Sequence, residues 1–199
     1  MTGFRAFGRM ARNPSSDVVA ALARDPEMRA AGVRTSLLPV HRHAAPRHLA
    51  RLLALHQPSA VLLLGVAAGR SAIHVERRAV NLYRGPRARH AGLPICAGAP
   101  SVLRSTLSVR LLRRAMASTR APVAYSDSAG TYACNLVLYS TLLWGRRGLP
   151  DGRPLRTLAA FVHLPATPES LGALHRSTPT LPLPTLVGAV RAALFTLVS

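Results

Sequence analysis

The sequence predicts a three-layer α/β/α fold, in which helices cover both faces of a mostly parallel, twisted sheet. Short apolar runs alternate with amphipathic segments along the chain, which is the pattern of an α/β domain. The chain of 199 residues can bury one core and has no visible internal repeat or second core, so residues 1–199 are expected to form a single domain. Hydrophobic residues make up 49% of the chain and aromatic residues only 5%, so Leu, Val and Ala are expected to build that core.

Helices are predicted where apolar residues recur at a spacing near 3.6 residues. The first opens on capping residues in "NPSSDVVAALARDP", and the second, "APRHLARLLALHQP", is bounded by prolines. The predicted helices are residues 13–26, 45–58, 102–119, 130–144 and 184–199.

Strands are predicted for the short apolar runs between these helices. The segment "SAVLLLGV" is continuously apolar, which is typical of a strand buried on both faces of a sheet. The predicted strands are residues 33–40, 59–66, 121–127 and 157–165, and residues 72–81 look extended. Segments rich in Gly, Pro and Arg at residues 81–100 and 145–156 are expected to be loops.

The formal net charge of +19 comes from arginine alone, because the sequence contains no lysine. A nucleic-acid partner is one interpretation of this charge, and a solvated cationic surface is the other. The arginines are scattered, and no zinc finger, basic leucine zipper or RNA-recognition signature accompanies them. We therefore do not expect nucleic-acid binding.

The N-terminal segment, the short apolar stretches and the cysteines favour a cytoplasmic protein. The N-terminal segment has no apolar core of a signal peptide, and the longest apolar stretch, residues 60–69, is too short to span a bilayer. Two cysteines, Cys96 and Cys134, do not make a disulfide framework, and neither lies in a Cys-x-x-Cys pair. We expect the thiols to be free, and we expect no membrane association.

Cys134 is the first candidate for a catalytic residue. It follows the strand at residues 121–127 and the turn "SAG", so it is expected in the first turn of the next helix. The exposed amides and the dipole at a helix N-terminus favour the thiolate, which is the reactive form. The alternative interpretation is that Cys134 is a small buried hydrophobic residue.

A cysteine nucleophile needs a base and a group that orients the base. His163 closes the strand at residues 157–165, and we expect it at the same edge of the sheet as Cys134. Glu76 follows the strand at residues 59–66 and shares a face with His74, because strand residues alternate between faces. The alternatives are a structural histidine before a proline and an ion pair of Glu76 with a neighbouring arginine.

Four segments together resemble the pyroglutamyl peptidase I (pyrrolidone-carboxylate peptidase) family of cysteine peptidases. They are "TGFRAFGRMARNPS", "GVAAGRSAIHVERRAVN", "SDSAGTYACN" and "FVHLPATPES", and they follow one another in the order found in the family. The resemblance implies that Cys134 is the nucleophile, His163 the general base and acid, and Glu76 the group that orients the imidazole. The implied reaction removes an N-terminal pyroglutamyl residue from a peptide through an acyl-enzyme, without a metal or cofactor.

The resemblance also implies a substrate pocket and an assembly. Phe4 and Phe7 correspond to the two phenylalanines that surround the lactam ring in the family, and Asn13 to an asparagine that supports the site. Val66 stands where family members have a glutamine, and the resemblance implies that this glutamine binds the lactam of the substrate. The family forms homo-oligomers, so a homodimer or homotetramer is implied.

Some positions depart from the family pattern. The strand that usually precedes Thr-Gly-Phe is reduced to Met1, Ala6 replaces a proline, and His74 replaces a small hydroxyl residue. Together with Val66, these departures leave two alternatives beside an active peptidase. One is a family member with weakened or shifted substrate recognition, and the other is a non-catalytic binding protein on the same scaffold.

Overall fold

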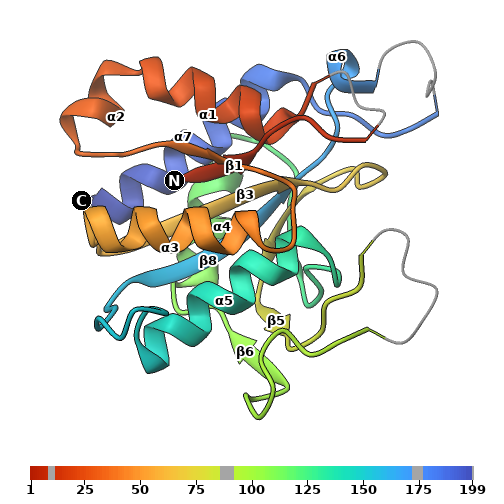
Figure 1. Cartoon of the computed structure of the whole chain (residues 1–199). Coiled ribbons are helices and arrows are strands. Elements are labelled where there is room, and N and C mark those ends of the chain that lie inside the picture. The colour runs from red at the N-terminus through yellow and green to blue at the C-terminus, as the bar shows by residue number, and fades with distance from the viewer. Residues whose placement is uncertain (9–11, 86–91, 172–176, 199) are drawn as a thin grey trace.

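A computed structural model describes residues 1–8, 12–85, 92–171 and 177–198 (Figure 1). Parts of the predicted loop at residues 81–100 and the last residue of the predicted helix at 184–199 lie outside these ranges. Within them, no helix is long and apolar enough to cross a membrane.

A six-stranded sheet forms the centre of the molecule, in the order β2-β1-β3-β8-β4-β7. The first four strands in this order run parallel, β4 runs antiparallel to β8, and β7 runs parallel to β4. The strand bounds are β2 (Ser36–Leu38), β1 (Thr2–Phe4), β3 (Ala60–Val66), β8 (Leu158–Leu164), β4 (Ile73–Glu76) and β7 (Val123–Ser126).

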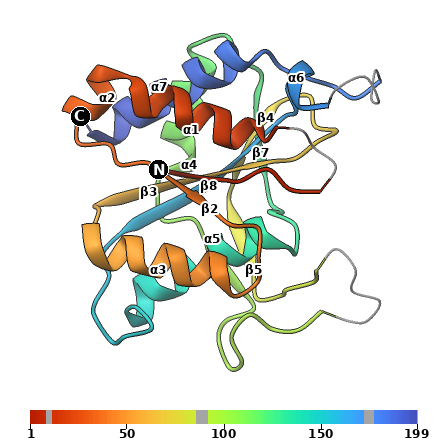
Figure 2. The same cartoon turned by 45° about the horizontal axis from the view of Figure 1, so that its top comes forward.

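Helices cover both faces of this sheet, which confirms the predicted three-layer class (Figures 1 and 2). One face carries α1 (Pro14–Arg24), α4 (Val109–Ala117) and α7 (Leu183–Val198), and the other carries α3 (Ala44–His56) and α5 (Ala133–Arg147). The short helices α2 (Pro26–Ala30) and α6 (Pro168–Leu171) complete the described helices.

Strand alternation divides the core between the two faces. In β3, Leu62 and Leu64 pack into the cluster formed with α1, α4 and α7, whereas Leu63 packs into the cluster formed with α3 and α5. In β8, Phe161 joins the α3 and α5 cluster and Val162 joins the other. The parity of a residue in these strands therefore decides which face its side chain occupies.

The helix predicted at residues 102–119 is wrong in its first part. Residues Val102–Arg104 form β6, which pairs with β5 (Arg78–Val80) in a separate antiparallel sheet. The helix α4 begins only after Ser108, whose hydroxyl accepts a hydrogen bond from the Leu111 amide at 3.4 Å. Leu103 and Leu107 have helical spacing, but a capping serine and the pairing with β5 override that periodicity.

The N-terminal strand is short but present. The sequence pattern reduced the strand before Thr-Gly-Phe to Met1. In the structure Thr2–Phe4 themselves form the strand, which pairs with β2 along its length and, at Thr2, with Leu63 of β3. The sheet therefore keeps the strand that carries Phe4.

Candidate active site

Glu76 and His163 meet on neighbouring strands of the sheet. In the antiparallel pair β4 and β8, Glu76 lies opposite Phe161 and His74 opposite His163. The side chains of Glu76 and His163 are buried, and His163 Nδ1 lies 2.7 Å from Glu76 Oε1. An ionised carboxylate only accepts hydrogen bonds, so Nδ1 carries the proton and Nε2 is left as the basic nitrogen.

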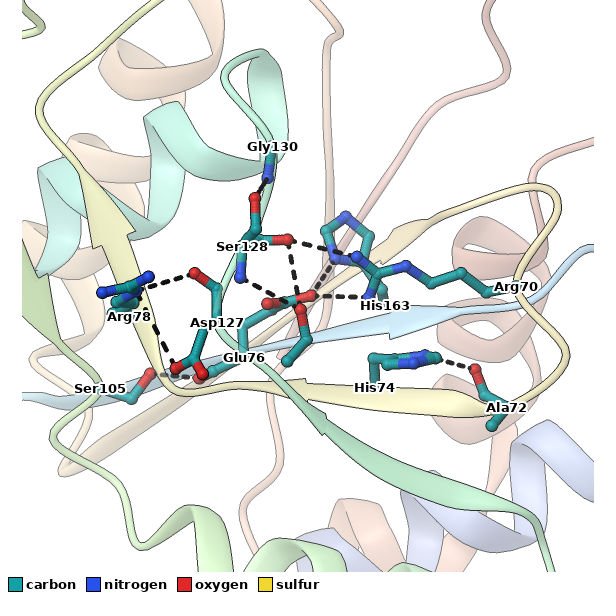
Figure 3. A network of polar contacts seen from close by, with 11 residues as sticks. Arg70, Ala72, His74, Glu76, Arg78, Ser105, Asp127, Ser128, Gly130 and His163 are labelled. Carbon is teal, nitrogen blue, oxygen red and sulfur yellow. Dashed lines mark hydrogen bonds and ion pairs between the residues drawn. The ribbon is translucent and has the colours of Figure 1, made fainter.

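Several groups keep the Glu76 carboxylate ionised despite its burial. Burial raises the pKa of Glu76, but the hydrogen bond that His163 donates and the charge of Arg70 lower it, and the net pKa lies below its usual value. Arg70 Nη1 donates to Glu76 Oε1 at 3.1 Å, and Figure 3 shows its guanidinium beside the carboxylate. The imidazole of His163 therefore has a charged, fixed acceptor.

Cys134 lies over the same part of the sheet. It is the second residue of α5, and a Cβ atom placed on Gly65 would come within 2.9 Å of Cys134 Sγ. Gly65 is the register partner of His163 in the parallel pair β3 and β8. The structure thus brings Cys134, His163 and Glu76 to one place on the face covered by α3 and α5.

The route by which Cys134 reaches this place differs from the prediction. We expected Cys134 and His163 at one edge of the sheet, but β7 runs antiparallel to β8, so the carboxyl ends of the two strands point in opposite directions. Ser126, the last residue of β7, pairs with Glu76, and the turn that follows leads to α5 over the sheet face. The candidate site therefore lies on the face of the sheet.

The protonation state of Cys134 also differs from the prediction. We expected the helix N-terminus to favour the thiolate, but burial raises the pKa of the Cys134 thiol to about 12, and the Glu76 charge acts in the same direction. The backbone amide of Cys134 and the charge of Arg70 oppose this increase without offsetting it. Desolvation of the sulfur outweighs the helix dipole, so the resting residue is a neutral thiol.

His163 is likewise uncharged at rest. Burial lowers the pKa of the imidazole below its ordinary value, and the hydrogen bond from Nδ1 to Glu76 opposes that decrease. The charges of Arg70 and His74 lower the pKa further. The ring packs against Phe161, with ring centroids 4.7 Å apart. A neutral imidazole beside a neutral thiol can act as a general base.

The predicted pocket phenylalanines differ in exposure. Phe4 is 3% exposed and belongs to the core cluster on the Cys134 face. Thr2 of the same strand pairs with Leu63 of β3, two residues before Gly65. Phe7 is 39% exposed and lies in the loop between β1 and α1. Phe4 therefore borders the site from within the core, and Phe7 is available at the surface.

Asn13 supports this loop from the start of α1. Its side-chain oxygen accepts hydrogen bonds from the Ser15 amide and hydroxyl at 3.0 and 2.9 Å, and its amide nitrogen donates to the Arg5 carbonyl at 3.1 Å. The Phe4 amide donates to the Ser15 hydroxyl at 3.0 Å. These bonds tie the end of β1 to the first turn of α1.

Val66 is not brought toward Cys134 by strand geometry. It is the last residue of β3 and continues the series of Leu62 and Leu64, which pack against the opposite helical layer. By alternation its side chain lies on the face opposite Gly65. Only the backbone of Val66, and not its side chain, can contact groups on the Cys134 face of the sheet.

Two residues of the site were missed in the sequence. Gly65 had a detectable signal, because an isolated glycine inside a strand indicates close approach of another group. Arg70 had none, since it is one of 26 basic residues, all arginine. Among the residues that the structure describes, no three His, Cys, Asp or Glu side chains gather as a metal site would require.

Comparisons with known proteins agree on one family. The model of the pyroglutamyl peptidase family, peptidase C15, matches residues 1–199. A pyrrolidone-carboxylate peptidase of Halalkalibacterium halodurans is 37% identical over 194 residues, covering 96% of this chain and 94% of its own. One from Deinococcus radiodurans is 37% identical over 191 residues, covering 92% and 84%. The crystal structure of pyroglutamyl peptidase I from Bacillus amyloliquefaciens superposes with a TM-score of 0.85 at 27% identity, covering 99% of this chain and 92% of that one.

Proposed function

This chain belongs to the pyroglutamyl peptidase family, and we propose that it removes N-terminal pyroglutamate from peptides with Cys134, His163 and Glu76 as its catalytic triad. The observation that carries the proposal is the hydrogen-bonded pair of Glu76 and His163 next to Gly65, over which the Cys134 sulfur lies. These are the nucleophile, base and orienting group that acyl transfer requires.

The resting protonation states suggest how the reaction begins. His163 Nε2 accepts the thiol proton as Cys134 Sγ attacks the carbonyl carbon of the amide bond that follows the pyroglutamyl ring. The imidazolium that forms is stabilised by the Glu76 carboxylate. Collapse of the tetrahedral intermediate breaks the amide bond, and the imidazolium donates its proton to the leaving amine. Water then attacks the thioester with His163 again as base, which releases pyroglutamate and the free thiol.

The N-terminus of α5 supplies candidate donors for the oxyanion. Its first residues, Ala133 and Cys134, follow Tyr132, which makes no side-chain capping hydrogen bond. The amides of the first turn of a helix have no intrahelical acceptor. They are therefore suited to stabilise the negative oxygen that develops during attack by Cys134.

The pyroglutamyl ring is flat and uncharged, so apolar contacts and a few polar anchors suit it. We propose that Phe4 and Phe7 contact this ring and that Asn13 supports them through its bonds to Ser15 and Arg5. We also propose a cytoplasmic homodimer or homotetramer, on the basis of the family resemblance. Light scattering of the purified chain tests the assembly.

Hydrolysis of pyroglutamyl-7-amido-4-methylcoumarin tests the function. The wild type is expected to release the fluorophore, Cys134→Ser to lose this activity, and Cys96→Ser to keep it. His163→Ala is expected to lose about 10²- to 10⁴-fold, the usual contribution of a general base. Wild-type rates in Cys134→Ser or His163→Ala, with the fold verified by circular dichroism, would overturn the assignment.

A further inference from the structure

Arg70 occupies a position between the acid of the triad and the segment that precedes the nucleophile. It lies in the connection from β3 to β4, and its Nη1 donates to Glu76 Oε1 at 3.1 Å. Its Nη2 donates to the Ser128 carbonyl at 3.3 Å, and Ser128 belongs to the turn between β7 and α5 (Figure 3). One guanidinium thus joins β4 to the turn that leads to Cys134.

The Glu76 carboxylate depends on this contact. Oε1 receives both the His163 and the Arg70 hydrogen bonds, while Oε2 is buried and accepts no hydrogen bond from the described residues. His163 is neutral at rest, so Arg70 is the permanent cation that contacts the carboxylate. A buried carboxylate that lost this cation would be costly to keep ionised beside a neutral imidazole, so protonation of His163 would be favoured to balance its charge.

We propose that Arg70 is a positioning residue of this active site, which holds Glu76 ionised and the Ser128 turn in register so that His163 and Cys134 stay aligned. The proposal rests on the function proposed above. Arg70 acts through Glu76 and Ser128, because its guanidinium donates to their oxygens and not to the sulfur or the imidazole. Lysine could replace the charge but not the two-point contact of a planar guanidinium.

The charged and titratable groups around His163 allow the effect of Arg70 on pH dependence to be stated with its sign. They are Glu76 and His74 from β4, Arg70 from the β3–β4 connection and Cys134 from α5. Glu76 favours the imidazolium, and Arg70 and His74 disfavour it. Removing the Arg70 charge leaves Glu76 less opposed, so His163 should become protonated at higher pH.

The test is the pH profile of kcat/KM for pyroglutamyl-7-amido-4-methylcoumarin in Arg70→Gln. We expect kcat/KM at pH 8 to fall by about 10- to 100-fold through misalignment. We expect the acid limb of the profile to move upward by about one pH unit. The fall should be mainly in kcat, because Arg70 is not proposed to contact substrate. A uniform fall with an unmoved acid limb would reduce Arg70 to a structural role and overturn the proposal.

Arg191→Gln is the matched control. Arg191 also pairs with carboxylates, those of Asp25 and Glu27, and its side chain is 34% exposed compared with 29% for Arg70. These partners are on α2 and at its start, on the other face of the sheet from Cys134. Arg191→Gln is expected to keep the wild-type pH profile of kcat/KM. This result would separate the effect of losing any surface ion pair from the effect of losing the Arg70–Glu76 pair.

A second measurement does not depend on substrate recognition. The rate of Cys134 alkylation by iodoacetamide, followed by mass spectrometry, should fall at pH 8 in Arg70→Gln by about threefold or more, because the Arg70 charge favours the thiolate. If the wild type failed to hydrolyse the pyroglutamyl substrate, the proposed function would fail. The comparison of alkylation rates would still test the role of Arg70. Equal alkylation rates in the two proteins would overturn the inference.

Arg70→Lys keeps the test decisive if Arg70→Gln does not fold. We expect this variant to show an acid limb close to that of the wild type, because the charge is retained, together with a lower kcat, because one ammonium cannot reproduce the two-point contact. Wild-type kcat in Arg70→Lys would contradict the claim that the two-point contact of Arg70 with Glu76 and Ser128 aligns the site.

Discussion

Replacing Gly65 with alanine should push Cys134, the proposed nucleophile, away from His163, its proposed base. A Cβ atom at this position would lie 2.9 Å from Cys134 Sγ and 2.7 Å from Phe161 Cζ. Ordinary contacts between such atoms are about 3.5–4.0 Å, so the sulfur and the ring must each move by roughly 1 Å. A displacement of this size at a reacting group can lower the rate by about 10²-fold.

The assay compares kcat/KM and thermal unfolding of Gly65→Ala with those of the wild type. We expect kcat/KM on pyroglutamyl-7-amido-4-methylcoumarin to fall by about 100-fold. Overpacking should lower the free energy of unfolding by about 1–3 kcal/mol. The rate effect should therefore exceed what the loss of folded protein at 25 °C can explain.

Gly188→Ala is the control for the methyl group itself. A Cβ atom on Gly188, in α7, meets no other atom within 4 Å. We expect it to leave kcat/KM unchanged and to stabilise the helix slightly, because alanine is favoured over glycine in helices. Wild-type kcat/KM in Gly65→Ala would refute the reasoning, because the sulfur could then not depend on the space above Gly65.

Three further predictions concern the same site. The pKa of His163 is lowered from its ordinary value of 6.5, so kcat/KM should hold from pH 7 to 6.5 and decline only below it; a decline centred above pH 7 would contradict a neutral resting imidazole. The pKa of Cys134 is raised to about 12, so its alkylation by iodoacetamide should still be accelerating with pH above pH 9, and a plateau near pH 7 would reveal a thiolate at rest. Val66→Gln should change kcat/KM by less than the roughly 2- to 13-fold of one neutral hydrogen bond, since its side chain is on the face opposite Gly65; a larger rise would show that residue 66 reaches the lactam.

The layers of the fold could be predicted because they follow from local patterns. The continuous apolar run of β3 can only be buried on both faces, and the helices on either side repeat apolar residues at 3.6-residue spacing. The break between β6 and α4 was not visible in this way, because Leu103 and Leu107 fit a helix by spacing alone. Pairing with β5, which is distant in sequence, decided the conformation of residues 102–104.

The three residues of the proposed triad could be named from motifs, but their environment could not be predicted. The direction of β7 depends on how the connections cross the sheet, so the expectation that β7 and β8 end at one edge was wrong even though the structure brings Cys134 and His163 together. The pKa of Cys134 depends on burial, which is a tertiary property, and a helix-dipole argument from sequence leaves it out. Arg70 could not be distinguished from the other arginines until its contacts with Glu76 and Ser128 were seen.

The proposed triad is divided between two layers of the fold, and this division affects how activity would be lost on heating. Glu76 and His163 are on β4 and β8, strands with a neighbour on each side, whereas Cys134 is in the first turn of a helix without a side-chain cap. Helix ends open at a lower free energy than central strands do, and such opening does not require the whole domain to unfold. Fraying of the first turn of α5 would withdraw the sulfur while the acid and base remain paired. Reversible inactivation should therefore precede the loss of β-sheet structure, and the stability of that one turn would set the working temperature range of the enzyme.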